Sequence, residues 1–384
     1  MRRRRFLEAL AAGTTVGLAG CRDGRPPGTP TPGTTRTAGV TSTPRTPTAA
    51  PLGNVSLPVP TEKLRAAIPK DQIPAIVDPE FAADWSTVDA PPEIDRPLLP
   101  DDTPILGVTR GGGARAYPLR ILNWHEVVND SFGGPLLVTY CVLCGSGVVA
   151  ERTAEGEETL FGVSGQLWRD DLVLYDQATE SLWSQLLATA IRGPLTGERL
   201  PLVPVTLATW GEWQRSNPNV DVLLPPPHSD TLRGREATYD YFEPKYHYGS
   251  ERQIIGYDSS GEPARRTLVL GIQNGTVARA YPFNAVREAD VVNDRVGDLP
   301  VVVTVTPGNG MEAYVRRVGN NVLRFRPAGK RHMKAGGSRW TRATGLATGG
   351  SHSGTRLTRA NENPPMFWIG WSNFHPDTDV YSGD

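Results

Sequence analysis

Two stretches of this chain repeat the same short motifs in the same order, and this repetition constrains the fold more than any other feature. The run Ala-Arg-Ala-Tyr-Pro at 114–118 recurs at 278–282, and Val-Val-Asn-Asp at 127–130 recurs at 291–294. Internal similarity at matched spacing is the signature of a repeated structural unit. We therefore predict that the chain contains a tandem duplication.

Each copy has the pattern of a β-hairpin followed by a short helix and further strands. In the first copy, glycines at 111–113 separate two β-rich runs, and Pro118 precedes a helical pattern with apolar side chains on one face over 119–129. Short strands interrupted by Gly, Pro and Asp follow. The predicted fold class is β-rich α+β, a tandem duplication of one β-hairpin/short-helix/β unit whose second copy is degenerate.

Shifts in composition set the predicted domain boundaries. Residues 22–60 are rich in Thr, Pro, Ala and Gly with hardly an apolar side chain, which predicts a disordered tether because such a segment cannot form a core. The predicted organisation is an export signal at 1–21, the tether at 22–60, an N-terminal lead-in at 61–100, the first copy at 101–225, an aromatic linker at 226–265 and the second copy at 266–384.

The N-terminus has the pattern of an export signal. Arginines at 2–5 precede Phe-Leu and a short apolar run, which ends in Leu-Ala-Gly immediately before Cys21. Paired arginines indicate the twin-arginine route, and small residues before a cysteine are typical of a lipoprotein signal. We expect lipidation of Cys21, which would hold the protein on the outer face of the cytoplasmic membrane. The alternative is a short anchor that is never cleaved.

Charge gives little indication of partners. The formal net charge is −1 at pH 7, so the sequence contains no general signal for nucleic-acid binding. The expected partner is the membrane, through the lipid anchor. The sequence identifies no small-molecule or protein partner.

Two of the three cysteines, Cys141 and Cys144, form a Cys-x-x-Cys-Gly motif between two β-rich runs. The motif therefore lies in a hairpin turn and not at the start of a helix, where thiol–disulfide oxidoreductases have it. A Cys-x-x-Cys turn is typical of a metal knuckle, and thiolates favour zinc or cuprous copper. A soft metal ion is the leading interpretation. A local disulfide, structural or redox-active, and an inert reduced pair are the alternatives.

His125 is the expected third metal ligand, because its helix directly precedes the strand that leads to Cys141. Aligning the copies on their shared motifs supports this choice, since the second copy lacks all three side chains together. The residues at the positions of His125, Cys141 and Cys144 are Ala289, Thr306 and Asn309. The alternative for His125 is a satisfied core histidine. The second copy is expected to be a scaffold.

Three other residues are site candidates with weaker support. Asp176 has the spacing to Thr179 of an Asx turn, which is the favoured interpretation. Gln185 is replaced by Arg342 in the second copy. His247 lies in the aromatic linker, from which it could close over the first copy.

Four motifs follow one another along the first copy. They are Asn-Trp-His-Glu-Val-Val-Asn at 123–129, Tyr-Cys-x-x-Cys-x-Ser-Gly at 140–147, Phe-Gly-x-Ser-Gly at 161–165 and Tyr-Asp-x-x-Thr-x-Ser-x-Trp-x-Gln at 175–185. Together they resemble an uncharacterised prokaryotic family, the domain of unknown function numbered 3179. The resemblance covers roughly residues 100–384 and implies a shared fold but no activity. Family members often have proline where this chain has Val142.

The sequence thus favours an extracytoplasmic, lipid-anchored protein that binds a soft metal ion, zinc or copper, in its first copy. Two other classes of function remain open. One is a thiol–disulfide redox protein that uses Cys141 and Cys144, and the other is a non-catalytic surface module with a structural cysteine pair. The sequence does not decide whether the protein is an enzyme.

Overall fold

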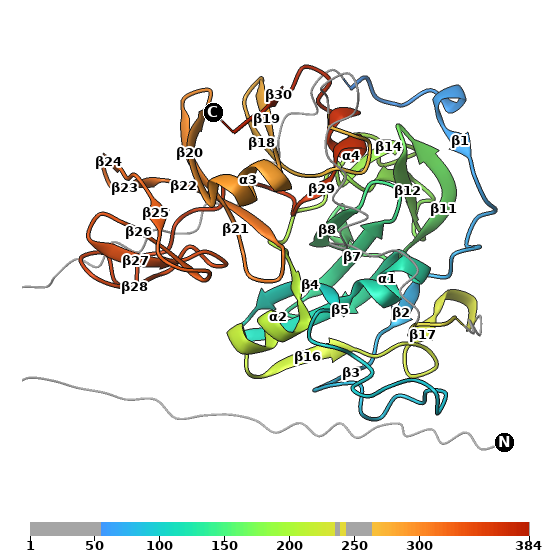
Figure 1. The fold of residues 1–384 in the computed structure, drawn as a ribbon. Helices are drawn as coiled ribbons and strands as arrows, with labels where there is room; N and C mark the ends of the chain where they lie inside the picture. Colours follow the sequence, from blue (N-terminus) through green and yellow to red (C-terminus); the bar gives the residue numbers. More distant parts are fainter. Residues whose placement is uncertain (1–54, 235–238, 243–262, 384) are drawn as a thin grey trace, which may run out of the picture. The chain divides into compact units, whose positions relative to one another are not determined.

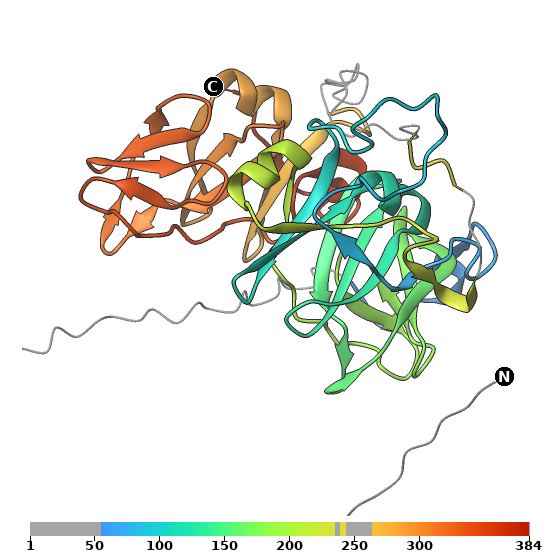
Figure 2. The ribbon, with the colours of Figure 1, turned by 90° about the horizontal axis from the view of Figure 1, so that it is seen from below.

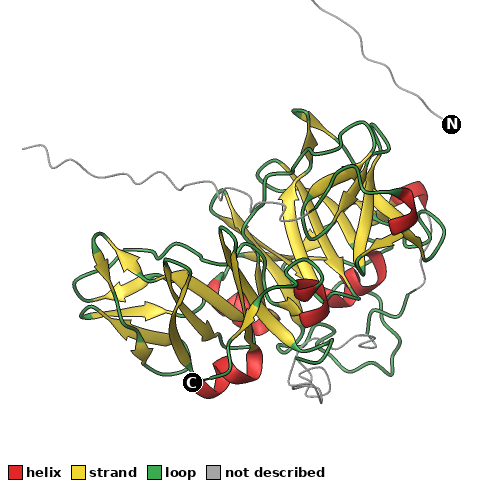
Figure 3. Cartoon of the chain, turned by 90° about the horizontal axis from the view of Figure 1, so that it is seen from above, coloured by secondary structure: helices red, strands yellow, loops and turns green. Residues whose placement is uncertain are grey.

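Short strands dominate the chain, because its runs of β-branched and aromatic residues are cut repeatedly by turn-forming Gly, Pro and Asp. The computed structural model describes residues 55–234, 239–242 and 263–383, which belong to one unit spanning residues 47–384. Strands make up 43% of the structure and helices 10% (Figures 1 and 3). Cys21 and His247 lie outside the described residues.

The predicted fold class was wrong. The described chain is mostly β, with six sheets of three to five strands and two smaller two-stranded sheets, and it is not an α+β duplication of one hairpin/helix/β unit. The repeated motifs determine a hairpin, the seven-residue helix after it and a side-chain contact, since Tyr117 donates to Asp130 as Tyr281 donates to Asp294. In both sheets the hairpin has one antiparallel and one parallel neighbour, but the first sheet has five strands and the second has four.

The cysteine motif belongs to a sheet of order β17-β2-β6-β7-β8. Its central hairpins are antiparallel, whereas β2 runs parallel to β6. Its strands are β17 (Asp230–Thr231), β2 (Ile76–Asp78), β6 (Val127–Ser131), β7 (Pro135–Cys141) and β8 (Ser146–Glu151).

Two further five-stranded sheets belong to the N-terminal part of the folded chain, and each includes a strand from the lead-in, which is blue in Figure 2. One consists of β15 (Thr206–Thr209), β4 (Pro104–Arg110), β5 (Gly113–Pro118), β16 (Val220–Leu223) and β3 (Phe81–Ala82). The other consists of β1 (Arg65–Ala66), β11 (Phe161–Trp168), β12 (Asp171–Asp176), β13 (Leu182–Ser184) and β14 (Thr189–Arg192). A small hairpin joins β9 (Thr153–Ala154) to β10 (Glu157–Glu158).

Smaller sheets form the C-terminal part. One is β29 (Met366–Phe367), β18 (Leu268–Asn274), β19 (Val277–Pro282) and β30 (Asp379–Val380), and a second is β20 (Val291–Val296), β21 (Leu299–Val305) and β22 (Met311–Val315). A third is β25 (Arg326–Pro327), β26 (His332–Ala335), β27 (Ser338–Thr341) and β28 (Ala347–Gly349). The remaining pair is β23 (Arg317–Val318) with β24 (Asn321–Val322).

The helices are short and serve as connections between strands. The α-helices are α1 (Leu119–His125), α2 (Trp210–Ser216), α3 (Phe283–Ala289) and α4 (Trp368–Ser372), and the 3₁₀ turns are η1 (Thr61–Lys63) and η2 (Leu232–Gly234). No helix in the described ranges is long and apolar enough to cross a membrane.

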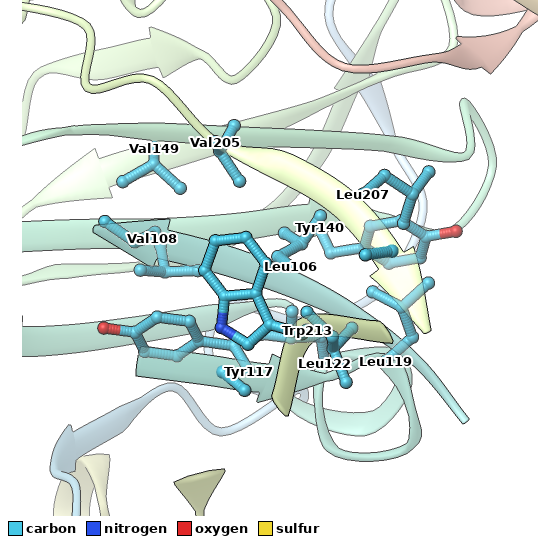
Figure 4. Packing of buried hydrophobic residues seen from close by; sticks show 14 of the residues in the cluster. Leu106, Val108, Tyr117, Leu119, Leu122, Tyr140, Val149, Val205, Leu207 and Trp213 are labelled. Carbon is cyan, nitrogen blue, oxygen red and sulfur yellow. The ribbon is translucent and has the colours of Figure 1, made fainter. Parts of the chain in front are cut away.

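Alternate side chains of β7 enter two separate cores, as the period of a strand requires. Leu136, Val138 and Tyr140 pack into the larger cluster, where Figure 4 shows Tyr140 near Leu106. Cys141 instead joins a second cluster, which contains residues of β11, β12 and β29. The cysteine motif therefore lies where strands from both ends of the chain meet.

Candidate metal centre

The two cysteines lie in the turn between β7 and β8, which confirms the predicted hairpin. Cys141 ends β7 opposite Ser146, and Gly145 has a φ of 57°, a value that favours glycine. The two Sγ atoms are 3.1 Å apart, and the Cys144 N–H points to the Cys141 Sγ at 3.4 Å. Both thiols are buried and not joined by a disulfide.

Asp171 is the third residue of the cluster. In the described part of the chain, Cys141, Cys144 and Asp171 form the group whose ligand atoms lie within 4.8 Å of one another. Asp171 opens β12 and is fully buried. Its carboxylate accepts hydrogen bonds from the Ser184 hydroxyl at 2.5 Å and the Leu186 N–H at 3.3 Å, which fix its orientation.

The turn that connects β11 to β12 also faces the thiols. Arg169 and Asp170 have φ values of 53° and 62°, so both are left-handed, as in the two-residue hairpin turn that suits the strand twist. This turn brings the Asp170 carbonyl oxygen to 3.1 Å from the Cys144 Sγ. The hairpin therefore supplies two oxygen donors, one from a side chain and one from the backbone.

The protonation of the group follows from its burial. The hydrogen bond with Cys141, together with desolvation and nearby acidic groups, raises the pKa of the Cys144 thiol well above its ordinary value. Burial raises the pKa of Asp171 to about 7, against the opposing effect of its hydrogen bonds from Ser184 and backbone N–H groups. A bound cation would reverse this preference, because a metal stabilises thiolate and carboxylate directly.

His125 lies outside this group, contrary to its predicted role as third ligand. Its Nδ1 is 2.7 Å from the Pro74 carbonyl oxygen, and its Nε2 is 2.7 Å from the Tyr241 hydroxyl. The ring is stacked with Tyr241 and meets Tyr239 edge-on. Burial lowers the pKa of His125 to about 4. His125 is therefore a satisfied core histidine, the alternative that the sequence left open.

Asp176 and Gln185 have supporting positions. The Asp176 carboxylate accepts hydrogen bonds from the Thr179 N–H at 2.7 Å and the Trp183 indole at 2.9 Å, so it holds the Asx turn that its spacing predicts. The buried Gln185 accepts a hydrogen bond from the Ser146 hydroxyl and donates to Thr139 Oγ1 and the Ser146 carbonyl. It thereby fixes β8 against β7 beside the cysteine turn.

Glu126, at the end of α1, has a buried carboxyl group. Asp290 follows α3 and binds the buried Arg342 guanidinium at 2.9 Å, whereas Glu126 follows α1 and has no ion pair within the described part of the chain. Glu126 has a φ of 56° and is largely buried. Burial raises the pKa of Glu126 to about 8.

The C-terminal part of the chain covers the cysteine turn. The Phe367 N–H donates to the Cys144 carbonyl oxygen at 2.8 Å. A Cβ built on Gly370 would lie 3.0 Å from the Cys144 Cβ, and one built on Gly145 would meet the Phe367 ring at 2.6 Å. These approaches leave both thiols at 1% exposure or less.

Sequence reasoning missed Asp171, although the sequence contains a signal for it. Asp171 directly precedes the run Leu-Val-Leu-Tyr, so an acidic residue begins a strand that is otherwise apolar on both faces. Buried carboxylates are rare unless they are hydrogen-bonded or bind a metal.

Comparison with known proteins gives one match. The family model described as "Protein of unknown function (DUF3179)" matches residues 70–378, which is most of the chain. No curated protein and no solved structure matches the chain.

Proposed function

The chain belongs to the DUF3179 family, and we propose that it binds one zinc ion through Cys141, Cys144 and Asp171. The observation that carries the proposal is the convergence of two thiols and a carboxylate within 4.8 Å in a buried site. Zinc accepts both thiolate and carboxylate ligands in tetrahedral geometry. Cuprous copper prefers soft ligands alone, so the presence of Asp171 favours zinc.

The geometry needs a modest adjustment to hold the ion. Zinc–sulfur bonds of about 2.3 Å in tetrahedral geometry separate the sulfur atoms by roughly 3.7 Å, compared with 3.1 Å between the two Sγ atoms here. The Asp170 carbonyl oxygen is close enough to Cys144 to be a fourth donor. Since the thiols are buried, this arrangement supports a closed, structural centre more than an open catalytic one.

The metal content of the full chain, purified without chelator, tests the proposal. We expect about one zinc ion per chain, and near-complete loss in Cys141→Ser and Cys144→Ser. Asp171→Asn should weaken zinc binding roughly 10- to 100-fold, which is the usual effect of mutating a residue that supports a metal ligand. His125→Ala is the matched control and should keep its zinc. A zinc loss in His125→Ala equal to that in Asp171→Asn would contradict the ligand assignment.

A second candidate is a dithiol–disulfide couple. The observation that favours it is the 3.1 Å separation of the Sγ atoms, which is shorter than the separation around a zinc ion. It predicts a chain without metal and without free thiols until reductant is added. Thiol titration of the freshly purified protein, alongside the metal analysis, distinguishes the two candidates.

We further propose that Cys21 is lipidated and holds the protein on the outer face of the cytoplasmic membrane. The support is the sequence pattern of arginines, a short apolar run and small residues before Cys21. Cys21→Ser should move the protein from the membrane fraction to the soluble extract. Unchanged retention after a high-salt wash would count against lipidation.

A further inference from the structure

One long stretch of the chain carries many cations and no acidic residue. Between Glu312 and Glu362 the sequence contains no Asp or Glu, although the formal net charge of the whole chain is −1. The cations of this stretch are Arg316, Arg317, Arg324, Arg326, Lys330, Arg331, Lys334, Arg339, Arg342, Arg356 and Arg359. Positive charge is therefore concentrated in the part of the chain that forms β23 to β28 (Figure 1).

Three of these cations stand side by side across neighbouring strands. Arg326 of β25 pairs in register with Lys334 of β26, and Lys334 pairs with Arg339 of β27. All three side chains are exposed, while Met333 and Trp340 between them are buried on the other face. We call Arg326, Lys334 and Arg339 the basic row. Its members lie about 4.8 Å apart from strand to strand.

Nothing in the described structure neutralises the basic row. No carboxylate among the described residues forms an ion pair with Arg326, Lys334 or Arg339, whereas Arg331 binds Glu212 at 2.8 Å. Like charges directly opposite one another destabilise a sheet. The side-chain contact of Arg339 is with His332, whose Nδ1 lies 2.9 Å from the guanidinium. Desolvation, and then the charges of Arg339, Arg331 and Arg342, lower the pKa of His332, so the ring does not add to the positive charge.

We propose that the exposed face of β25–β27 docks onto anionic phospholipid headgroups through the basic row. An unneutralised row of cations on a sheet matches an extended anionic surface, which would relieve the repulsion within the row. A membrane is the favoured anionic surface because the lipidation proposed for Cys21, on which this choice rests, would keep the protein at a membrane. The proposal is independent of the metal centre, because the row and the cysteines belong to different sheets.

Vesicle binding by the full chain carrying Cys21→Ser tests the proposal without a lipid anchor. The probes are vesicles of phosphatidylcholine alone and of phosphatidylcholine mixed with phosphatidylglycerol. The triple variant Arg326→Gln/Lys334→Gln/Arg339→Gln removes the row. It should bind the anionic vesicles at least about tenfold more weakly than its parent, and added salt should weaken the parent's binding.

A second triple variant makes the same change in net charge elsewhere. Arg65, Arg215 and Arg265 are exposed and each forms an ion pair with an aspartate, so their replacement by Gln should change vesicle binding little. Thermal unfolding provides the check on folding. The row variant loses a repulsion but also the contact of Arg339 with His332, so it should melt close to its parent.

Three outcomes would overturn the proposal. The first is an equal loss of binding in both triple variants, which would indicate net charge alone. The second is equal binding of the parent to both kinds of vesicle. The third is binding to heparin without binding to anionic vesicles, which would assign the row to a soluble polyanion.

Discussion

Glu126 has an unusual environment for an acidic side chain. Its carboxyl is buried at the end of α1 and has no ion pair among the described residues, while Asp290 at the end of α3 binds Arg342. A buried carboxyl without a counter-ion favours its protonated form. In the first copy, Gln185 stands at the position aligned with Arg342, so the cation that binds Asp290 has no equivalent there. Gln185 instead makes hydrogen bonds with Thr139 and Ser146.

This state of Glu126 predicts how stability changes with pH. The folded pKa of about 8 lies above the ordinary value of 4.5, so between these values the folded chain holds a proton that the unfolded chain lacks. Stability should therefore fall as the pH rises from about 4.5 to about 8. Glu126→Gln should remove the part of this fall that Glu126 causes, while the raised pKa of Asp171 still contributes to the rest. The variant should be more stable than the parent at pH 8, by on the order of a few kcal/mol.

Denaturant unfolding at several pH values measures the effect. At pH values near 4 the Glu126→Gln variant and its parent should have similar stability, because the carboxyl is then protonated in both states. Glu157 is exposed and provides the matched control, since Glu157→Gln should alter the free energy of unfolding by less than about 0.5 kcal/mol. If the free energy of unfolding changed with pH equally in Glu126→Gln and its parent, the raised pKa of Glu126 would be refuted.

Among single residues, the sequence predicted those that act through local spacing and not those that act through distant contacts. Cys141 and Cys144 lie in the predicted turn because the short spacing between them and the glycine that follows determine the turn locally. Asp171 was missed because it reaches the thiols from another sheet. His125 was misassigned because its partners, Pro74 and Tyr241, come from segments whose contact with α1 no local pattern indicates.

At the scale of one element, the β7–β8 turn offers a comparison of two glycines. Gly145 and Gly319 have φ values of 57° and 56°, but a Cβ on Gly145 would meet the Phe367 ring at 2.6 Å, whereas one on Gly319 would lie in open space. Gly319→Ala should cost about 1 kcal/mol, from backbone conformation alone. Gly145→Ala should cost roughly 3 kcal/mol, because it must also displace Phe367.

The difference between the two free energies of unfolding measures the contact of the β7–β8 turn with Phe367 of β29. Equilibrium unfolding gives both free energies, and zinc content shows whether moving Phe367 also disturbs the thiols. Equal destabilisation by the two substitutions would show that Phe367 gives way freely. For the short helices, Pro118 predicted where α1 begins, but the predicted helix extended to residue 129. In the structure α1 ends at His125, before the left-handed Glu126.

For the whole molecule, local patterns correctly indicated many short strands and wrongly indicated the class. Repeated motifs predicted two equivalent units, and each hairpin does have one antiparallel and one parallel neighbour. However, β3 extends only the first hairpin's sheet, and β2 and β17 extend the sheet of β6–β8 with no counterpart beside β20–β22. Strand partners of this kind are chosen by burial of apolar faces across the whole chain. Local sequence patterns therefore predict where strands form but not which strands pair with one another.

The contact between Phe367 and Cys144 joins residues from the first and the last third of the folded unit. During synthesis, the segment with both cysteines emerges long before the strand that covers it. A nascent chain therefore presents two accessible thiols until the segment around Phe367 has docked. An ion captured before that step would be enclosed when β29 docks. A chain truncated before β29 would keep its cysteines exposed, which would distinguish incomplete molecules from finished ones.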